Sequence, residues 1–427
     1  MMDKVTILDV IKVALASTIG SIIEWYDFFL YGIVASLVFP RLFFPPGYSL
    51  AAATLLSLTT YAVGFIARPI GAFIFGHIGD KQGRRTSLLL DLVIMGLASL
   101  IIGFLPSYRV IGFGSIIIAA IVRLIQGIAV AGEWAGAVTW LVETASGSRW
   151  RAFWGSWVYQ GGQMGLISAT LAVAFLGFNA SFFLHTGWRI AFWVGALVAF
   201  IGIIIRFLLI ESPLFQKIKI NGEINRYPSL QVWKEYYGTI ILLALGWVAL
   251  NALTYIYSTY AILYETELHV ARTIASLEVT IATAFSMLLL IIFSIIGDKL
   301  GRKKVLYILY AIGIIFSFPY AALLREGTPV AGIIAQLLIT LPIAGFAIIP
   351  AFFAEQFPTR FRYSGTGLSY NIATPIGGAL SPILLQAFIG TNVLGNWWVI
   401  GTVILIYFII SISALTFLKE TRGKEMK

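Results

Sequence analysis

The sequence predicts an all-α membrane protein in which twelve transmembrane helices form two pseudo-symmetric six-helix halves. Three observations lead to this prediction. The chain of 427 residues is 59% hydrophobic and only 11% charged, whereas soluble domains carry about 25% charged residues. Apolar stretches long enough to cross a bilayer, about 20 residues each, recur along the whole chain. A short charged motif between two of these stretches recurs at an equivalent place later in the chain.

Twelve apolar segments are candidate spans, and their even number places both termini on one side of the membrane. The first is too long for a cleavable signal peptide and is interpreted as a true span. The predicted spans lie near residues 14–40, 51–78, 86–105, 110–141, 151–177, 187–210, 238–264, 271–297, 303–324, 328–354, 363–389 and 394–418.

Lysine and arginine predict the orientation, because basic residues gather in cytoplasmic connections. One set of connections holds Lys81, Arg84, Arg85, Arg149, Arg151, Lys217, Lys219, Arg226, Lys234, Lys299, Arg302, Lys303, Lys304, Arg360 and Arg362, and both tails add more. The opposite set holds only Arg41, Arg109, Arg189, Arg272 and Arg325. We therefore expect a multi-pass protein of the cell membrane with both termini in the cytoplasm. The same rule explains the net charge of +10 without a nucleic-acid partner.

Two motifs indicate that the halves arose by duplication. "GDKQGRR" (79–85) follows the second predicted span, and "GDKLGRK" (297–303) follows the eighth, 218 residues later. Glu143 with Arg149 and Arg151 follows the fourth span, and Glu355 with Arg360 and Arg362 follows the tenth. We expect residues 1–210 and 238–427 to form the halves, with 211–237 as a cytoplasmic linker. Substrate binds between such halves, near the middle of the membrane.

Several functions lack their residues in this sequence. Cysteine is absent, and His77, His185 and His269 are far apart, so we expect no disulfide, metal site or cofactor. The phosphate-binding, zinc-protease and serine-hydrolase motifs are also missing. A membrane enzyme is a weak alternative because no catalytic cluster is seen, and a receptor is another because the tail after Lys419 is short.

The loop "GHIGDKQGRR" (76–85) joins two predicted spans by a tight, charged turn. Gly76 and Gly83 allow close packing and a sharp turn. Asp80 can pair with arginines on the same side, as a latch that breaks when the halves move. The alternative is a simple topology anchor, and the second copy favours the latch.

The pattern G-x-x-x-D-x-x-G-R-R in this loop resembles the signature of the major facilitator superfamily, although the second copy has Ser294 for the first glycine. Over its whole length the sequence is similar to the metabolite:proton symporter family. The strings that carry the likeness are "EWYDFFLYG" (24–32), "ARPIGAFIFGHIGDKQGRR" (67–85), "RLIQGIAVAGEWAGA" (123–137), "ESPLF" (211–215) and "AEQFPTRFRYSGTGLSYN" (354–371). One departure is Ala131, where the family often has a second glycine before Glu133.

The resemblance implies the major facilitator fold and proton-driven transport of small metabolites. Members of the family carry di- and tricarboxylates, shikimate, aromatic acids, proline or betaine. We expect import of an organic acid or zwitterion by a monomer in the lipid bilayer, with an exporter or uniporter as the alternative. The residues expected to control the movement of the halves are Gly76, Asp80, Gly83, Arg84, Arg85, Glu143, Arg149, Asp298, Arg302, Glu355 and Arg360.

Glu24 and Asp27 interrupt the first span, although a charge at the bilayer centre costs at least about 2.5 kcal/mol. They share one helix face. Asp27 and Arg123 both lie about 17 Å from the outer ends of their helices, so they can pair if the helices adjoin. Related sugar porters have such an acid and arginine, and Arg68 lies nearer Glu24. We expect Asp27 to carry the proton.

The other buried polar residues are assigned by depth. Glu24, Arg123 and Glu133 are expected to assist proton coupling. The substrate-binding candidates are Arg68, Arg123, Gln160, Gln163, Tyr255, Tyr257 and Asn371. Arginine at depth favours an anionic group, because a guanidinium binds a carboxylate through two hydrogen bonds. The alternative is that the charges form static pairs and the aromatic residues only pack.

Overall fold

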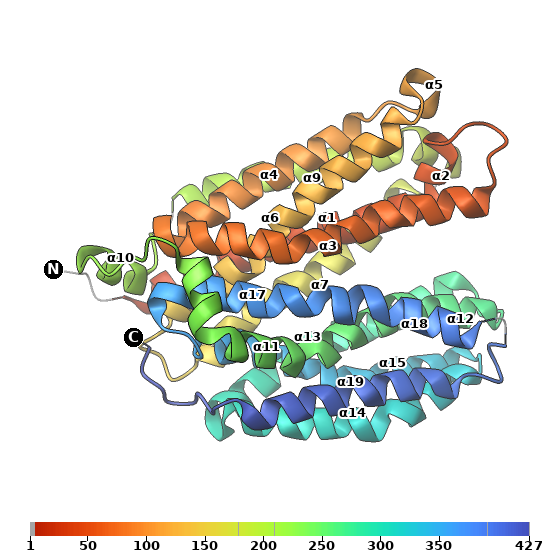
Figure 1. The fold of residues 1–427 in the computed structure, drawn as a ribbon. Helices are drawn as coiled ribbons and strands as arrows, with labels where there is room; N and C mark the ends of the chain where they lie inside the picture. Colours follow the sequence, from red (N-terminus) through yellow and green to blue (C-terminus); the bar gives the residue numbers. More distant parts are fainter. Residues whose placement is uncertain (1–4, 178, 209, 391, 427) are drawn as a thin grey trace.

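The structure is a computed structural model that describes residues 5–177, 179–208, 210–390 and 392–426. Within these ranges the regular structure is helical, without a β-strand, and the helices form two stacked groups (Figure 1). Ten helical segments are long and apolar enough to span a membrane by composition. Helices α1 and α7, of 31 and 26 residues, complete the predicted twelve among the described residues.

The first group contains six long helices and three short ones. The long helices are α1 (Ile7–Leu37), α3 (Leu50–Gln82), α4 (Arg84–Phe104), α6 (Gly114–Thr144), α7 (Arg151–Leu176) and α9 (Trp188–Phe207), which η1 (Phe183–Gly187) precedes. The short helices are α2 (Phe39–Leu42), α5 (Tyr108–Ile111) and α8 (Ala180–Phe182).

The second group follows helix α10 (Pro213–Ile220) and contains several interrupted helices. One chain segment is α11 (Pro228–Tyr255), η2 (Ile256–Tyr260) and α12 (Ala261–Glu267), and the next are α13 (Arg272–Leu300) and α14 (Arg302–Arg325). Then come α15 (Pro329–Ile343), η3 (Ala344–Ala347) and α16 (Ile349–Ala354). The last are η4 (Thr359–Phe361), α17 (Arg362–Thr374), η5 (Pro375–Ala379), α18 (Leu380–Ile389) and α19 (Trp398–Phe417).

Two helix starts differ from the sequence prediction. Helix α1 begins at Ile7, because Thr6 and Asp9 cap its N-terminus through reciprocal hydrogen bonds. Helix α11 begins at Pro228, ten residues before the predicted span, and its backbone leaves helical geometry at Tyr236. The expected linker, 211–237, therefore contains α10 and the first turns of α11. Its polar residues hid these helices from an analysis of apolar runs.

The two groups meet through four long helices, since α3 packs against α17 and α7 packs against α13. A stack of three rings crosses the interface. The ring of Tyr370 lies between Trp134 of the first group and Trp247 of its own group, at centroid distances of 3.7 and 4.2 Å. Stacked aromatic rings of this size bury a large apolar area between the two groups.

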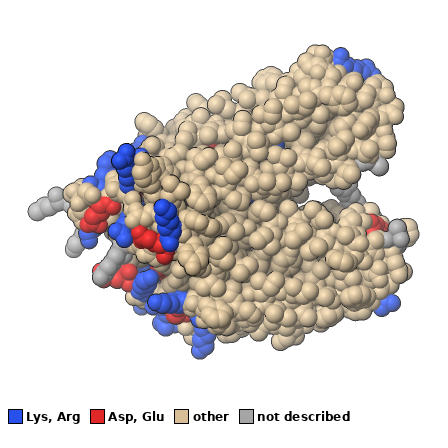
Figure 2. All heavy atoms as spheres, viewed as in Figure 1, with Lys and Arg blue, Asp and Glu red and all other residues tan. Residues whose placement is uncertain are grey.

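The ends of the bundle differ in charge and in closure. Most visible Lys and Arg side chains gather where α1 begins and α19 ends, which we call the basic end (Figure 2). We call the opposite end the far end. There, a cleft separates the two groups in the space-filling view. Apolar side chains dominate the surface between the ends, and Phe175, for example, is 84% exposed. A surface of this kind suits lipid rather than water.

Candidate functional site

Asp27 is held by three polar side chains from two neighbouring helices. Its carboxylate accepts hydrogen bonds from Ser99 of α4 and from Gln126 Nε2 of α6, the latter at 2.7 Å. Arg123 Nη1 lies 3.9 Å from the carboxylate. The predicted Asp27–Arg123 pair is therefore present but long. Ser99 and Gln126 were not predicted, because polar uncharged side chains stand out little from an apolar run.

Glu24 faces a different helix from Asp27, although both lie on α1. Its Oε1 atom is 3.7 Å from Arg68 Nη2 of α3, as the depth of Arg68 suggested. Both residues are buried. The Arg68 guanidinium also lies 5.2 Å from the ring centre of Phe28, where the aromatic face stabilises its charge. The two acids of α1 therefore pair with different arginines, Glu24 with Arg68 and Asp27 with Arg123.

Arg68 and Arg123 line one narrow space, which is too small to hold a ligand in this conformation. Phe28, Gly64, Arg68, Arg123, Gly127 and Val130 line it. Arg68 Nη2 and the Nε and Nη2 atoms of Arg123 are buried without a hydrogen-bond acceptor among the described residues. Gly64 is required at this wall, since a β-carbon there would lie 3.0 Å from Arg123 Nε. Unused guanidinium donors on one pocket suit an anion, which accepts several charge-assisted hydrogen bonds.

The predicted binding residues of α7 and the second group differ in how near they lie to Arg68 and Arg123. Tyr255 reaches the first group, where its ring packs 5.4 Å from that of Phe65, and its hydroxyl has no hydrogen-bond partner among the described residues. Gln160 donates to the carbonyl of Met287 across the interface, at 2.8 Å. Gln163 and Tyr257 approach each other at the same interface. Tyr255 is thus the predicted second-half residue nearest the arginines.

Asn371 has a packing role in this structure. Its Nδ2 atom donates to the carbonyls of Ala131 at 3.1 Å and Gly367 at 2.9 Å. It therefore joins α17 to α6 through a backbone carbonyl. A buried asparagine satisfies its donors wherever a carbonyl is in reach, which depth alone does not reveal.

Glu133 lies in a separate cluster from Asp27. It forms a bidentate pair with Arg206 of α9, in which Arg206 Nη1 donates to Oε2 at 2.6 Å. Asp91 of α4 is also buried and faces Glu133. Neither Arg206 nor Asp91 was predicted as a site residue. Each interrupts an apolar run as Glu24 does, so the same signal would have found them.

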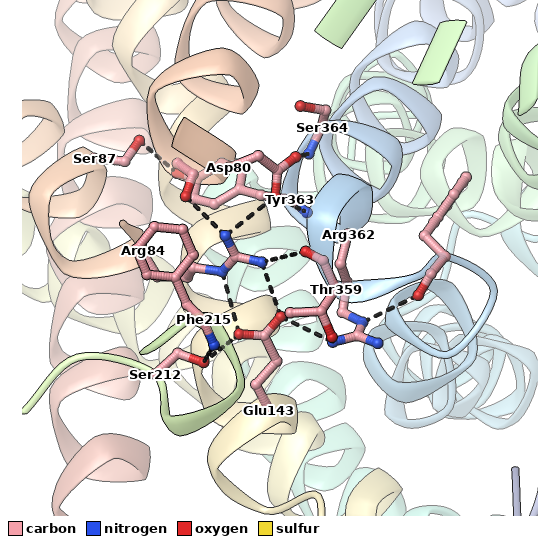
Figure 3. Close-up of polar contacts among 12 residues, drawn as sticks. Asp80, Arg84, Ser87, Glu143, Ser212, Phe215, Thr359, Arg362, Tyr363 and Ser364 are labelled. Carbon is pink, nitrogen blue, oxygen red and sulfur yellow. Dashed lines mark hydrogen bonds and ion pairs between the residues drawn. The ribbon is translucent and has the colours of Figure 1, made fainter. Parts of the chain in front are cut away.

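The first latch closes the basic end between α3, α6 and α17 (Figure 3). Glu143 binds Arg84 of its own half and Arg362 of the other half, each at 2.9 Å. Asp80 accepts hydrogen bonds from the backbone N–H groups of Tyr363 at 3.2 Å and Ser364 at 2.8 Å. A carboxylate is favourable there because the first N–H groups of a helix lack intrahelical partners.

The second latch repeats this chemistry with the halves exchanged. Glu355 binds Arg302 of its own half and Arg151 of the other, each at 3.2 Å. Asp298 accepts from the backbone N–H groups of Ala152 and Phe153 at the start of α7, at 3.0 and 2.9 Å. The duplicated motifs thus predict a duplicated contact across the interface.

Three of the predicted gating residues, Arg85, Arg149 and Arg360, lie outside the latch pairs. Arg149 and Arg360 are not the latch arginines. The structure assigns that role to Arg151 and Arg362, two residues further along the chain. Arg149 lies over the Trp150 ring, and Arg360 forms an exposed pair with Glu235 at 4.0 Å. The spacing Arg-x-Arg left the choice open, because only the start of the following helix decides which arginine points inward.

Arg85 likewise lies outside the latch, since its guanidinium donates to the Phe207 carbonyl. The glycines of the loop have distinct purposes. A β-carbon at Gly76 would lie 2.8 Å from the backbone of Ser364, so this glycine permits close approach of α3 and α17. Gly83 has a φ of 122°, which glycine adopts readily.

Two helical groups that are closed together at one end and open at the other, with buried charges inside the first group, define the architecture of a secondary transporter. Comparison with known proteins agrees. Residues 18–382 match the family model described as Major Facilitator Superfamily, and the chain belongs to this superfamily.

Curated relatives are metabolite transporters. The chain is 34% identical to the inner membrane metabolite transport protein YhjE of Escherichia coli K12, over 89% of this chain and 88% of that protein. It is 33% identical to the E. coli shikimate transporter, over 96% and 95% of the two chains. It is 30% identical to a putative proline/betaine transporter of Staphylococcus aureus, over 97% and 90%.

Solved structures of the proton:xylose symporter XylE have the same fold. One, bound to 6-bromo-6-deoxy-D-glucose, matches with a TM-score of 0.74 at 19% identity, over 98% of each chain. An inward-open conformation of XylE from E. coli matches with a TM-score of 0.66, over 97% of this chain and 98% of that one. The chain is therefore a multi-pass membrane transporter of small molecules, not an enzyme.

Proposed function

We propose that this transporter imports a small metabolite with a carboxylate group together with protons, across the cell membrane. The observation that carries the proposal is the pocket in which Arg68 and Arg123 present unused N–H groups. The names of two relatives support it, since shikimate, proline and betaine all contain a carboxylate.

Charge balance links the substrate to the proton. Glu24 and Asp27 offset Arg68 and Arg123, so the buried site is neutral when all four are ionised. A bound carboxylate adds one negative charge, and an uncompensated buried charge is costly. Protonation of one acid restores neutrality. The carboxylate substrate and one proton therefore bind more favourably together than either does alone.

We propose Asp27 as the proton carrier and Glu24 as the residue that positions Arg68. When substrate draws Arg123 away from Asp27, the carboxylate loses its cationic neighbour and takes up a proton more readily. Ser99 and Gln126 can bond either form of the acid, because each offers both a donor and an acceptor. We assign no coupling role to Glu133, since a bidentate pair with Arg206 holds it apart from Asp27.

We also propose that the basic end is cytoplasmic, so that the cleft of Figure 2 faces outward. The density of Lys and Arg at that end supports this orientation. In this state the two latches keep the cytoplasmic side closed. Their release, with closure of the far end, would expose the pocket to the cytoplasm.

Uptake into liposomes tests the proposal. Purified protein in vesicles should accumulate labelled shikimate, proline or betaine only when the outside is more acidic. A thermal-shift screen of organic acids and zwitterions selects the substrate to label. Accumulation that ignores the pH gradient, or equilibration without accumulation, would contradict proton symport and favour a uniporter.

The Asp27→Asn variant separates binding from coupling. Asn mimics the protonated acid, so the variant should bind substrate and exchange it across the membrane but fail to concentrate it. Glu24→Gln is the matched control, since it neutralises the neighbouring acid on the same helix. If Asp27→Asn vesicles still concentrate substrate and Glu24→Gln vesicles do not, the carrier is Glu24 and our assignment is wrong.

The Arg68→Lys variant tests the binding group. Lysine keeps the charge but loses the planar fork of donors, so we expect substrate affinity to fall at least tenfold, which is about 1.4 kcal/mol. Isothermal titration or thermal shift against substrate concentration measures this. Unchanged affinity would leave Arg68 with a structural role only.

A further inference from the structure

A second group of buried acids lies in the second half, apart from the arginine pocket. Glu265, near the end of α12, and Glu278 of α13 are only 1% and 3% exposed and face each other. Both reach Gly332 of α15, where a β-carbon would lie within 3.0 Å of a carboxylate oxygen from each. Glycine at this position therefore makes room for two acids between three helices.

Two polar side chains complete the group. Gln336 lies one turn after Gly332 on the same face of α15, and Tyr320 comes from α14. Both are fully buried, and the Tyr320 hydroxyl faces both Gln336 and Glu265. Neither amide atom of Gln336 has a hydrogen-bond partner among the described residues. The group is thus lined by oxygen atoms from four helices.

The number of unsatisfied atoms distinguishes this group. Five buried oxygens lack a hydrogen-bond partner within the described ranges: Glu265 Oε2, both carboxylate oxygens of Glu278, Gln336 Oε1 and Tyr320 Oη. Each buried polar group left unsatisfied costs about 1–3 kcal/mol. Native proteins usually satisfy such groups with an ordered water or an ion. Five such oxygens in one place indicate that a molecule or ion binds between them.

The charges around the group indicate that the occupant is positively charged. Among the described residues, no Lys or Arg pairs with Glu265 or Glu278, whereas Glu24, Asp27 and Glu133 each have an arginine. Among the side chains that the structure describes, the titratable groups that face this cluster are these two acids and Tyr320, with Tyr257 beyond it. None supplies a positive charge at neutral pH. A cation would both neutralise the acids and satisfy the oxygens.

We propose that Glu265, Glu278, Gln336 and Tyr320 bind a hard metal cation through oxygen atoms. Carboxylate, amide and hydroxyl oxygens suit Na⁺ and Ca²⁺ rather than softer metals. The ion would join α12, α13, α14 and α15 at the far end of the second half. It would therefore stabilise that half in itself, independently of substrate and of proton coupling.

Ion-dependent unfolding tests the proposal on purified full-length protein. In buffer with choline as the only added cation, we expect the unfolding temperature to rise by several degrees on addition of NaCl or of CaCl₂. Choline chloride at equal ionic strength is the control, and the ion that acts at the lower concentration identifies the occupant. If neither salt exceeds choline chloride, the proposal is wrong, and a rise of the unfolding temperature on acidification alone would show that the acids share a proton instead.

Variants assign the response to these residues. Glu278→Gln and Gln336→Leu should abolish the ion-dependent rise, even if Glu278→Gln is as stable as the unchanged protein without ions because it loses an unpaired buried charge. Glu326→Gln, which removes an exposed carboxylate just after α14, is the matched control and should keep the full response. An undiminished response in both test variants would overturn the assignment. If one test variant does not fold, the other decides.

Discussion

The two latches share their chemistry and differ in what supports them. In the first, Glu211 and Ser212 of the linker bind the Arg84 backbone and Glu143. In the second, Glu420 and Thr421 of the C-terminal tail bind the Arg302 backbone and Glu355. The linker is anchored by helices on both sides, whereas the tail follows the last helix. Duplication thus reproduced the contacts but gave them unequal supports.

The second latch is also the more open one. The side chain of its cross-half arginine, Arg151, is 8% exposed, whereas that of Arg362 is 1% exposed. A cavity of about 410 Å³ borders both latches, with Glu355 of the second and Arg362 of the first in its wall. In the first latch, Arg84 is covered by the Phe215 ring at 4.8 Å. Since buried ion pairs are screened less by solvent, we expect the first latch to hold the basic end closed more strongly.

Replacing Glu143 or Glu355, the acid at the centre of each latch, should have the largest effect. Glu143→Gln removes the anion that Arg84 and Arg362 share, although Arg84 keeps its pair with Asp80 at 3.2 Å, and breaking a buried pair costs about 3–5 kcal/mol. Glu355→Gln should cost less, because the Arg151 side chain is 8% exposed and water can replace part of the lost interaction. Thermal unfolding and the labelling of a single cysteine at the interface measure the loss.

The cysteine-free sequence makes that labelling specific. Ser229→Cys reports on the first latch, since Ser229 contacts Ser364, and Ala152→Cys reports on the second. Glu143→Gln should speed the labelling of Ser229→Cys, and Glu355→Gln should speed that of Ala152→Cys. Equal stability loss in both variants would remove the proposed difference between the latches.

The helix-capping acids should give a smaller, more equal effect. Asp80→Asn and Asp298→Asn each replace one acceptor oxygen by an amide that cannot accept. Their hydrogen-bond lengths are similar, 3.2 and 2.8 Å for Asp80 and 3.0 and 2.9 Å for Asp298. We expect transport to slow about tenfold in both, which corresponds to about 1.4 kcal/mol, with substrate affinity changed only a few-fold. Collapse of affinity with an unchanged rate would contradict a gating role.

Glu211 and Glu420, the acids that support the two latches, should show the smallest effect. Here we expect the change in the second latch to be larger than the change in the first. Burial raises the pKa of Glu211, with partial compensation from the Ser212 N–H and Arg84. Burial also acts on Glu420, but N–H groups of Arg422, Arg302, Lys303 and Thr421 outweigh it and lower its pKa. The fold therefore favours the charged form of Glu420 and disfavours that of Glu211.

The signs follow from linkage. Ionised Glu420 contributes stability that is present above its ordinary pKa and is lost as pH falls through its lowered value. Glu211 instead contributes stability at low pH that is lost as pH rises through its raised value. At neutral pH, Glu420→Gln should speed hydrogen exchange of the Arg302 and Lys303 amides several-fold. Glu211→Gln should change that of Arg84 and Arg85 less, and the opposite order would refute the charge argument.

Charged residues in apolar runs were the most informative part of the sequence. The cost of burying a charge is so high that Glu24, Asp27, Arg68 and Arg123 had to be partnered or functional. The helix count, the fold and the superfamily were likewise predicted correctly, because span length and a repeated motif are local properties. The exact boundaries of the halves and the roles of the site residues stay predictions.

Partner choice was decided by the tertiary structure. Depth along a helix placed Asp27 level with Arg123, but it gave no sign that Glu133 lies against Arg206 or that Asn371 turns to a carbonyl. The spacing Arg-x-Arg did not distinguish Arg362 from Arg360. Glu265 lay just beyond a predicted span, so it resembled a loop residue until helix packing placed it beside Glu278 and Gln336. A sequence fixes how deep a side chain lies, whereas its neighbours depend on which helices pack together and how each is rotated about its axis.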